Sequence, residues 1–380
     1  MDGHVKAPRA KYRDYIDPGF RDQFDEWLAR VDGTPDGFVR PQMEDGQWDP
    51  NRRLVDLATQ GVVAEVLFPN GTAFAEGRID YAPDPALTRQ ANMAYNRWLV
   101  DFCSEGQGRL VGQALVAFDD VEQAVADVHW AKDQGLGGVV MPPLYPGSKF
   151  FFDPVLDPIW AACQEVGLPL SQHGGTGAPD YQPAGFAAIL VLATEHSFFS
   201  GRSMWQMMLG GVFDRFPELK LAFVETEAWW IGPMIEHLDR RMSMGDDWTE
   251  FAQFIKRERA FSRLASEYWH DNCYAGISPF HPSQISVDGL GTKDADDTAG
   301  FHIDSGNAMF GVDYPHFESI FPDTMEHVAT LVGNPHVTEA DARKILYGNA
   351  ADVYAFDLAA LQSTFDEFGF ELDDLVPADA

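Results

Sequence analysis

The sequence predicts a (β/α)8 barrel with insertions. Apolar runs of strand length alternate with amphipathic helical segments along the 380 residues, and eight runs can be counted, near residues 2, 64, 112, 139, 170, 221, 274 and 309. Strands separated by helices pair in parallel, and eight of them can close into a barrel. The competing prediction is a doubly wound sheet with a cap domain. Against it, the chain has no Gly-x-Gly-x-x-Gly after a first strand, no Gly-x-x-x-x-Gly-Lys and no Gly-x-Ser-x-Gly.

The elements are placed by hydrophobic periodicity and by the residues that end each pattern. The first strand, around Asp2 to Val5, is very short, and the later strands are expected at 62–68, 109–117, 138–141, 168–172, 219–224, 272–277 and near 309. Helices are expected at 18–31, 49–60, 85–104, 121–134, 154–166 and 229–242. Pro315 is compatible with the first turn of a further helix over 317–327.

We expect residues 1–380 to form one domain. Residues 9–48 and a long helical segment at 185–213 are expected to be insertions into the barrel. Residues 286–300, which include Gly289, Gly291 and the acidic run from Asp294 to Asp297, are expected to form a mobile loop, and closing helices should occupy 338–380.

The charge of the chain excludes several classes of partner. Fifty-nine Asp and Glu against 27 Lys and Arg give a formal net charge of −32, so the protein should repel nucleic acids and anionic membranes. Its three cysteines are widely spaced, which favours neither a disulfide framework nor a paired-cysteine metal site and fits a reducing compartment. The N-terminus has no signal-peptide pattern and no apolar run approaches about 18 residues. A soluble cytoplasmic protein is therefore expected.

Candidate metal ligands lie where several predicted strands end. Asp2 and His4 belong to the first strand, His173 follows the fifth, Glu225 the sixth and Asp313 the eighth. The carboxyl ends of barrel strands form one ring, so these side chains should converge although they are far apart in the sequence. Neutral imidazole and carboxylate oxygen are ligands that Zn²⁺, Mn²⁺ and Fe²⁺ accept. A divalent-metal site at this rim is therefore plausible.

Each candidate also has a structural explanation. Asp313 could be a helix cap or a turn former, and Glu225 could accept hydrogen bonds from strand-end amides. His173 could be a core histidine with satisfied hydrogen bonds. His316, which follows Pro315, could cap a helix or pair with a neighbour.

Several motifs at these positions point to a known family. They are Asp2-Gly-His4-Val, Leu170-Ser-Gln-His173-Gly-Gly, the run from Phe216 to Glu225, Phe310-Gly-Val-Asp313-Tyr-Pro-His316 and Lys344-Ile-Leu-Tyr-Gly-Asn349. Together they resemble the amidohydrolase superfamily over nearly the whole chain. The resemblance is to its amidohydrolase-related branch, which includes aminocarboxymuconate-semialdehyde decarboxylase and the resorcylate-type decarboxylases.

The resemblance implies one divalent transition-metal ion bound by Asp2, His4, His173 and Asp313. Zinc is the first expectation, with manganese and iron as alternatives. The fourth strand offers no lysine that could be carboxylated as a bridging ligand, which implies one ion rather than two. Glu225 stands where many relatives have histidine, so a carboxyl group must serve in place of that imidazole, or no group does.

Three functions stay open at this point. The leading interpretation is a hydrolase, in which a metal-activated water, deprotonated by Asp313, attacks a carbonyl or related bond of a small aromatic or cyclic molecule. The alternative is a metal-dependent decarboxylase that releases CO₂ from a small carboxylic acid. A decarboxylase would need a cationic side chain near the metal, for which the candidates are Arg40, Arg78 and Arg202. The third interpretation is a metal-free binding or scaffold barrel.

The candidate catalytic residues are Asp313, Glu225 and His316, and the expected partner is a small-molecule substrate that the sequence does not identify. A homodimer is also expected. The family resemblance favours it, and the segments 9–48 and 185–213 carry more Phe, Trp and Met than solvated loops need.

Overall fold

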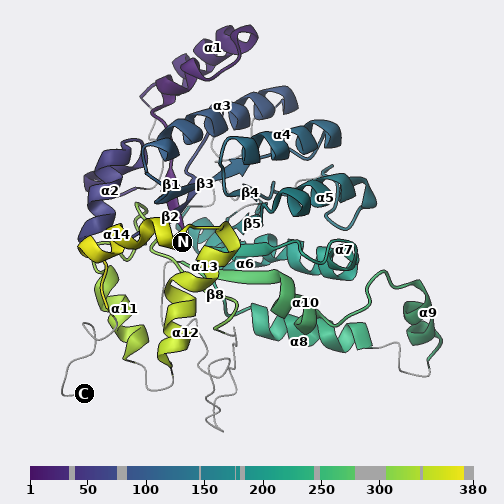
Figure 1. Ribbon diagram of the computed structural model, residues 1–380. Helices are drawn as coiled ribbons and strands as arrows, with labels where there is room; N and C mark the ends of the chain where they lie inside the picture. The colour runs from purple at the N-terminus through teal and green to yellow at the C-terminus, as the bar shows by residue number, and fades with distance from the viewer. Residues whose placement is uncertain are drawn as a thin grey trace.

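The computed structural model describes residues 1–33, 39–74, 84–144, 147–175, 177–179, 185–243, 249–278, 305–333 and 337–371. Its eight strands form one parallel sheet in sequence order (Figure 1). The strands are β1 (Gly3–Val5), β2 (Glu65–Pro69), β3 (Leu110–Leu115), β4 (Gly138–Val140), β5 (Leu170–His173), β6 (Leu221–Val224), β7 (Cys273–Ile277) and β8 (Ala308–Phe310).

The first strand and the chain after the eighth strand close the sheet. Gly3 forms a parallel bridge with Tyr314. The amide of His4 donates to the carbonyl of Tyr314 at 2.7 Å, and the amide of Asp313 donates to the carbonyl of Asp2 at 3.0 Å. These bonds place Asp2, His4 and Asp313 side by side at the seam, and they confirm the predicted (β/α)8 barrel.

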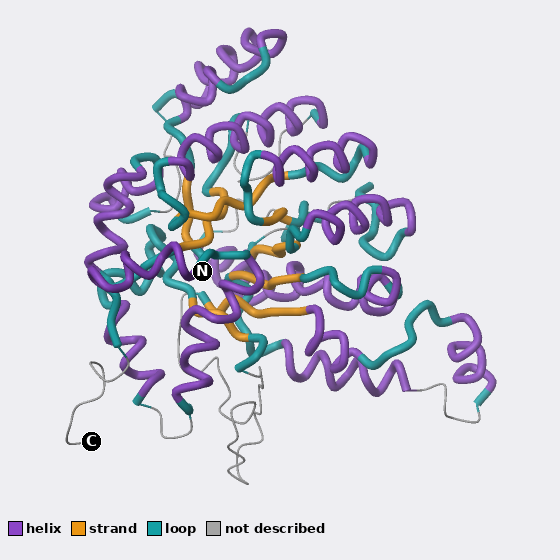
Figure 2. Tube along the Cα trace, viewed as in Figure 1, coloured by secondary structure: helices purple, strands orange, loops and turns teal. Residues whose placement is uncertain are grey.

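Helices surround the strands (Figure 2). They are α1 (Arg21–Val31), α2 (Pro50–Thr59), α3 (Pro85–Ser104), α4 (Val121–Asp133), α5 (Asp157–Val166), α6 (Phe186–Leu209), α7 (Val212–Arg215), α8 (Ile231–Met242), α9 (Glu250–Glu258), α10 (Ala265–Asn272), α11 (Thr324–Val332), α12 (Glu339–Arg343), α13 (Asn349–Tyr354) and α14 (Leu358–Phe368).

Local sequence explains where these elements begin and end. Every residue of β2, β4, β6 and β8 is buried, as expected of parallel strands covered on both faces. Asp49, Asp84 and Asp120 precede α2, α3 and α4, and their carboxylates accept hydrogen bonds from amides of the first turn. Gly167 ends α5 in the left-handed conformation, with φ of 67°.

The helix expected over 317–327 is wrong in its first half. The structure has a loop up to Asp323, and α11 begins at Thr324. The guanidinium of Arg40 donates to the carbonyls of Phe317, Ser319 and Phe321, so an arginine far away in the sequence satisfies groups that a helix would have paired internally. The loop therefore follows from a tertiary contact.

The expected insertions differ in form. Within the described part of residues 9–48 the chain forms short 3-10 turns and α1, whose Phe24 and Trp27 pack on Phe74. Residues 185–213 form the long helix α6 and the short helix α7. The mobile loop expected at 286–300 lies outside the described residues.

A buried ion pair supports the seam of the barrel. Arg53, fully buried on α2, donates to Glu65 at 2.7 Å and to the carbonyl of His4 at 2.9 Å. It also donates to the carbonyl of Tyr314 at 3.3 Å and lies over the ring of that tyrosine. One guanidinium therefore holds both backbones that close the barrel, and in this way it supports the position of His4.

The structure also describes the state of the cysteines and the length of the apolar helices. All three cysteines are free. Within the described part of the chain, no helix is both long and apolar enough to span a bilayer.

Candidate metal centre

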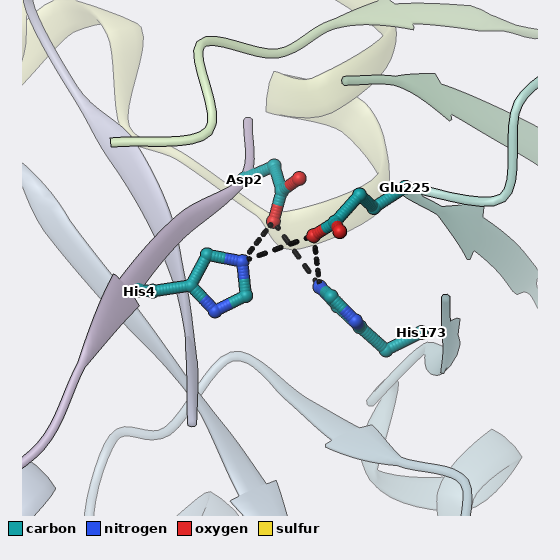
Figure 3. A group of neighbouring side chains, drawn as sticks. All are labelled: Asp2, His4, His173 and Glu225. Carbon is teal, nitrogen blue, oxygen red and sulfur yellow. Dashed lines mark hydrogen bonds and ion pairs between the residues drawn. The ribbon is translucent and has the colours of Figure 1, made fainter. Parts of the chain in front are cut away.

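Side chains from four strand ends meet at the carboxyl end of the barrel, and Figure 3 shows those of Asp2, His4, His173 and Glu225. His4 Nε2 lies 3.4 Å from Asp2 Oδ1, 3.3 Å from Glu225 Oε2 and 3.3 Å from Asp313 Oδ1. His173 Nε2 lies 3.4 Å from both Asp2 Oδ1 and Glu225 Oε2. Of the four residues proposed as metal ligands, the structure thus brings Asp2, His4 and His173 together with Glu225. Asp313 lies beside His4, in an overlapping group with Glu225 and His316.

The backbone has a positive φ at each of the three residues that carry these carboxylates. Asp2, Glu225 and Asp313 have φ values of 79°, 52° and 60°. Residues other than glycine rarely adopt this left-handed region, and the conformation costs about 1–3 kcal/mol each where the surrounding structure enforces it. Its occurrence at three converging carboxylates indicates that the fold sustains strain in order to aim them at one point.

The polar atoms of the cluster fit a metal ion. Two atoms that bind one ion at about 2.0–2.2 Å lie roughly 3.0–3.5 Å apart at octahedral or tetrahedral angles. The nitrogen–oxygen distances of 3.3 to 3.4 Å fall in this range. Among the described residues, buried atoms without a hydrogen-bond partner include Asp2 Oδ2, His4 Nε2, Glu225 Oε2 and both carboxylate oxygens of Asp313. Buried polar atoms are costly to leave unpaired, and a shared cation would satisfy them all.

The charge of the cluster also favours a cation. Burial lowers the pKa of His4, but its contacts with Asp2, Asp313 and Glu225 outweigh burial and hold the pKa well above its usual value. Burial raises the pKa of Asp2, yet contacts with His173 and His4 hold it well below its usual value. Three converging carboxylates therefore stabilise positive charge at their centre.

One side of the cluster is open to solvent. Asp2 and Asp313 are fully buried and His4 is nearly so, whereas the side chains of Glu225 and His173 remain 23% and 13% exposed. A small molecule therefore has access from the side of β5 and β6.

Close packing between two loops positions Glu225. The amide of Gly174 donates to the carbonyl of Val224 at 2.8 Å, and a Cβ at Gly174 would overlap the carbonyl oxygen of Glu225. After Glu225, the indole of Trp230 donates to the carbonyl of Thr226 at 2.9 Å. Gly174 is therefore required, because any side chain at this position would prevent the close approach of Glu225.

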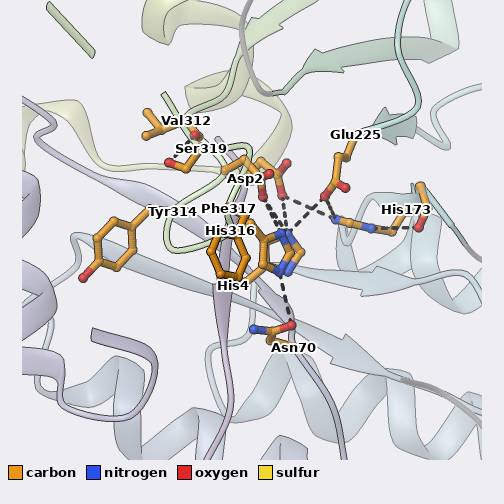
Figure 4. Close-up of polar contacts among 12 residues, drawn as sticks. Asp2, His4, Asn70, His173, Glu225, Val312, Tyr314, His316, Phe317 and Ser319 are labelled. Carbon is orange, nitrogen blue, oxygen red and sulfur yellow. Dashed lines mark hydrogen bonds and ion pairs between the residues drawn. The ribbon is translucent and has the colours of Figure 1, made fainter. Parts of the chain in front are cut away.

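His316 extends the cluster through residues that sequence reasoning missed (Figure 4). Its Nδ1 lies 2.8 Å from Asp313 Oδ1, and its Nε2 lies 3.2 Å from Asn70 Oδ1. The amide nitrogen of Asn70 donates to Gln47 Oε1 at 2.7 Å, so the Asn70 oxygen faces His316 and accepts from Nε2. Asn70 thereby directs Nδ1 of His316 toward Asp313.

Three arginines were proposed as the cationic side chain that a decarboxylase needs near its metal, and the structure places two of them. The guanidinium of Arg40 donates hydrogen bonds to carbonyls of the loop that follows His316, so Arg40 stabilises this loop. Arg202 lies on α6 directly after Gly201, where a Cβ would overlap the ring of Trp230. Arg78 lies outside the described residues.

The fold and the cluster define a class of protein. A parallel (β/α)8 barrel with imidazoles and carboxylates at its strand ends is the architecture of metal-dependent barrel enzymes. The sequence model of the amidohydrolase family matches residues 1–356. The chain belongs to this family, which confirms the resemblance found in its motifs.

Three similar proteins illustrate the comparison. A gamma-resorcylate decarboxylase of Polaromonas sp. is 21% identical over 317 residues, which is 80% of this chain and 86% of that protein. An amidohydrolase of Mycobacterium avium subsp. paratuberculosis has a TM-score of 0.66 at 20% identity, covering 93% of this chain and 98% of its own. A 5-carboxyvanillate decarboxylase of Novosphingobium aromaticivorans, solved with bound manganese, has a TM-score of 0.64 at 19% identity, covering 88% and 94%.

The comparison corrects the leading interpretation of the sequence. A hydrolase was expected, but the curated relative is a decarboxylase, and similar solved structures are 2,6-dihydroxybenzoate and 5-carboxyvanillate decarboxylases. The alternative of a carboxy-lyase is therefore favoured. The two reactions use the same kind of metal site, which is why the ligand motifs did not distinguish them.

Proposed function

We propose that this protein is a metal-dependent, non-oxidative decarboxylase of a small aromatic carboxylic acid that carries a hydroxyl group beside its carboxylate. The observation that carries the proposal is the metal-fitting cluster at the open end of the barrel. The similar proteins include decarboxylases of gamma-resorcylate, 2,6-dihydroxybenzoate and 5-carboxyvanillate, which supports it. We further propose that residues 1–380 form one domain, because a single family model spans most of them.

One divalent ion would be held by two imidazoles and three carboxylates, those of His4, His173, Asp2, Glu225 and Asp313. The proposal combines two overlapping groups whose ligand atoms lie within 4.8 Å of one another, Asp2, His4, His173 and Glu225 in the first and His4, Glu225, Asp313 and His316 in the second. This set enlarges the four ligands expected from the sequence by Glu225. Carboxylate ligands suit manganese, whereas zinc sites are typically rich in thiolate or imidazole ligands. Manganese is also the ion bound in three of the similar decarboxylase structures. We therefore propose manganese in place of zinc.

When bound, the ion would act as a Lewis acid that holds the substrate's carboxylate and hydroxyl oxygens. Asp313 lies at the buried side of the cluster. We assign it the role of the acid that donates a proton to the ring carbon bearing the carboxylate. His316, aligned by Asn70, lies 2.8 Å from Asp313 and can hold or resupply that proton. The carbon–carbon bond then breaks, its electron pair stays with the ring, and CO₂ leaves.

Isotope labelling tests this reaction. We expect the manganese-loaded protein to release labelled CO₂ from carboxyl-carbon-13 2,6-dihydroxybenzoate or 5-carboxyvanillate, or from a close hydroxybenzoate, and to place one deuterium on the ring in D₂O. Protein treated with a chelator is the control and should be inactive until metal is restored. The proposal is wrong if no hydroxybenzoate loses CO₂ while the same preparation hydrolyses an aromatic ester or lactone in a metal-dependent way.

A further inference from the structure

A buried hydroxyl at the end of β7 lacks a hydrogen-bond partner. Ser278 directly follows this strand and is 2% exposed. Among the residues that the structure describes, no group accepts from its Oγ or donates to it. A buried polar atom left unpaired costs free energy, so native proteins retain one chiefly where a ligand or an ordered water completes it. The metal cluster by itself does not account for this hydroxyl.

The hydroxyl of Ser278 points into the barrel. Side chains alternate between the two faces of a strand, so Ser278 lies on the same face as Gly276. A Cβ at Gly276 would overlap Sδ of Met1, which precedes β1. Because β8 separates β7 from β1 around the barrel, Gly276 and Met1 meet across its interior. Ser278 therefore projects inward, two residues nearer the carboxyl end of the barrel than Gly276.

The end of β7 lies between the strands that carry two of the carboxylates. On one side, the amide of Glu225 donates to the carbonyl of Gly276 at 3.3 Å. On the other side, the amide of Gly311, two residues before Asp313, donates to the last carbonyl of β7 at 2.9 Å. Ser278 is thus placed on the inner wall between the strand ends of Glu225 and Asp313.

The hydroxyl supplies an uncharged hydrogen donor beside groups that only accept. Ionised carboxylates have no hydrogen to donate, and the Nε2 atoms of His4 and His173 face the proposed ion. A substrate's carboxylate has two oxygens, and an oxygen that the ion does not bind needs a donor from the protein. Arg40 does not provide it, because its guanidinium is bonded to the loop after His316. Ser278 offers such a donor.

We propose that Ser278 Oγ donates a hydrogen bond to a carboxylate oxygen of the substrate, and that this bond selects a carboxylated ring over the same ring without its carboxylate. The inference rests on the proposed function, because it assigns a contact to that substrate. Ser278 would hold the substrate, whereas Asp313 delivers the proton. Loss of the hydroxyl should therefore weaken substrate binding much more than it slows the chemical step.

A neutral donor suits this reaction better than a cationic side chain. As the carbon–carbon bond breaks, negative charge leaves the carboxylate for the ring, and the CO₂ that departs is neutral. A lysine or arginine paired with the carboxylate would stabilise the bound substrate more than the transition state, which raises the barrier. A single hydroxyl orients the carboxylate through a weaker interaction. The cationic contact expected from the sequence is thus not required.

An ordered water is the competing partner, because a water in a polar gap would also complete the hydroxyl. A water contact would leave the choice between carboxylated and uncarboxylated ligands unchanged. A structural hydrogen bond would make the protein less stable when the hydroxyl is removed. We expect neither result. Since Ser278 Oγ has no partner in the described chain, Ser278→Ala should melt at the same temperature as the wild type or higher in metal-free protein.

Two related ligands of the manganese-loaded protein test the proposal. They are the hydroxybenzoate that loses CO₂ in the labelling experiment and its decarboxylated product, and 2,6-dihydroxybenzoate with resorcinol is the first such pair. Single-turnover CO₂ release at rising substrate concentration gives the half-saturating concentration, and product inhibition gives the affinity for the product. We expect Ser278→Ala to raise the half-saturating concentration roughly 10- to 100-fold, the effect of one hydrogen bond to a charged group, with product affinity nearly unchanged.

Thr324→Val is the matched control. Thr324 Oγ1 is likewise buried and without a hydrogen-bond partner among the described residues. The amide of Thr324 donates to Gln60 Oε1 at 3.2 Å, and Gln60 lies just before β2, at the opposite end of the barrel from the cluster. Valine removes the hydroxyl and keeps the shape of the side chain. This variant should keep the wild-type affinity for both ligands.

The outcomes separate this inference from the proposed function. Equal weakening of both ligands by Ser278→Ala would place the hydroxyl against a part of the ring that they share and would overturn the proposal. An unchanged half-saturating concentration, or a lowered melting temperature, would overturn it as well. In these cases the wild type still releases CO₂, so the proposed function stands. Wild-type protein that releases no CO₂ from any hydroxybenzoate overturns both.

Discussion

Replacing Asp313 by asparagine should lower turnover by a factor of roughly 10² to 10⁴, the range that a general acid or base contributes. The amide keeps the size of the side chain and one oxygen for the ion, but it cannot deliver the proton. Because the other four ligands remain, metal content should fall far less than turnover. Both quantities are measured on one preparation, by single-turnover CO₂ release and by elemental analysis.

The control for this variant is Asp84→Asn. Asp84 is a carboxylate whose side chain caps α3, accepting from the amide of Ala86 at 2.8 Å. Its replacement should cost at most about 1 kcal/mol of stability and leave turnover intact. If Asp313→Asn behaved in the same way, with normal activity and normal metal, Asp313 would have no part in proton transfer.

Removing two ligands together should abolish metal binding. A His173→Ala, Asp313→Ala variant keeps only three of the five proposed ligands and leaves a buried anionic site that no longer encloses an ion. We expect the metal content of protein purified without chelator to fall from near one ion per chain to near zero.

A variant with two surface changes, His270→Ala and Asp366→Ala, serves as the matched control and should keep its ion. Full retention of metal by the His173→Ala, Asp313→Ala variant would show that the ion binds elsewhere. Circular dichroism of both variants establishes that any loss of metal is not a loss of fold.

The barrel could be predicted from sequence because its signals are local and repeated. Each buried strand is a short apolar run, and residues such as Gly135 and Gly167 end the preceding helices at the predicted places. The helix expected after Pro315 failed for the opposite reason. Arg40, more than 250 residues earlier, binds the carbonyls that would have formed it, and no local pattern records that contact.

The cluster was predictable only in part. Asp2, His4, His173 and Asp313 stand in motifs at strand ends, so their convergence follows from the fold. Glu225 was expected to be catalytic, and its place among the ligand atoms depends on the bend of the backbone at its positive φ.

Asn70 gave no usable signal. It lies in a Pro-Asn-Gly turn where asparagine is common for conformational reasons. Its role depends on Gln47, which comes from a segment interpreted as an insertion, and on His316 from the other end of the chain. Only the assembled barrel brings these three side chains together.

The central claim is that this cluster is a site for one metal ion, and titration of metal-stripped wild-type protein with Mn²⁺ tests it most directly. Isothermal titration calorimetry, with elemental analysis of the dialysed product, should give one ion per chain, released again by a chelator. A stoichiometry of two ions, or no binding to folded protein, would contradict the account.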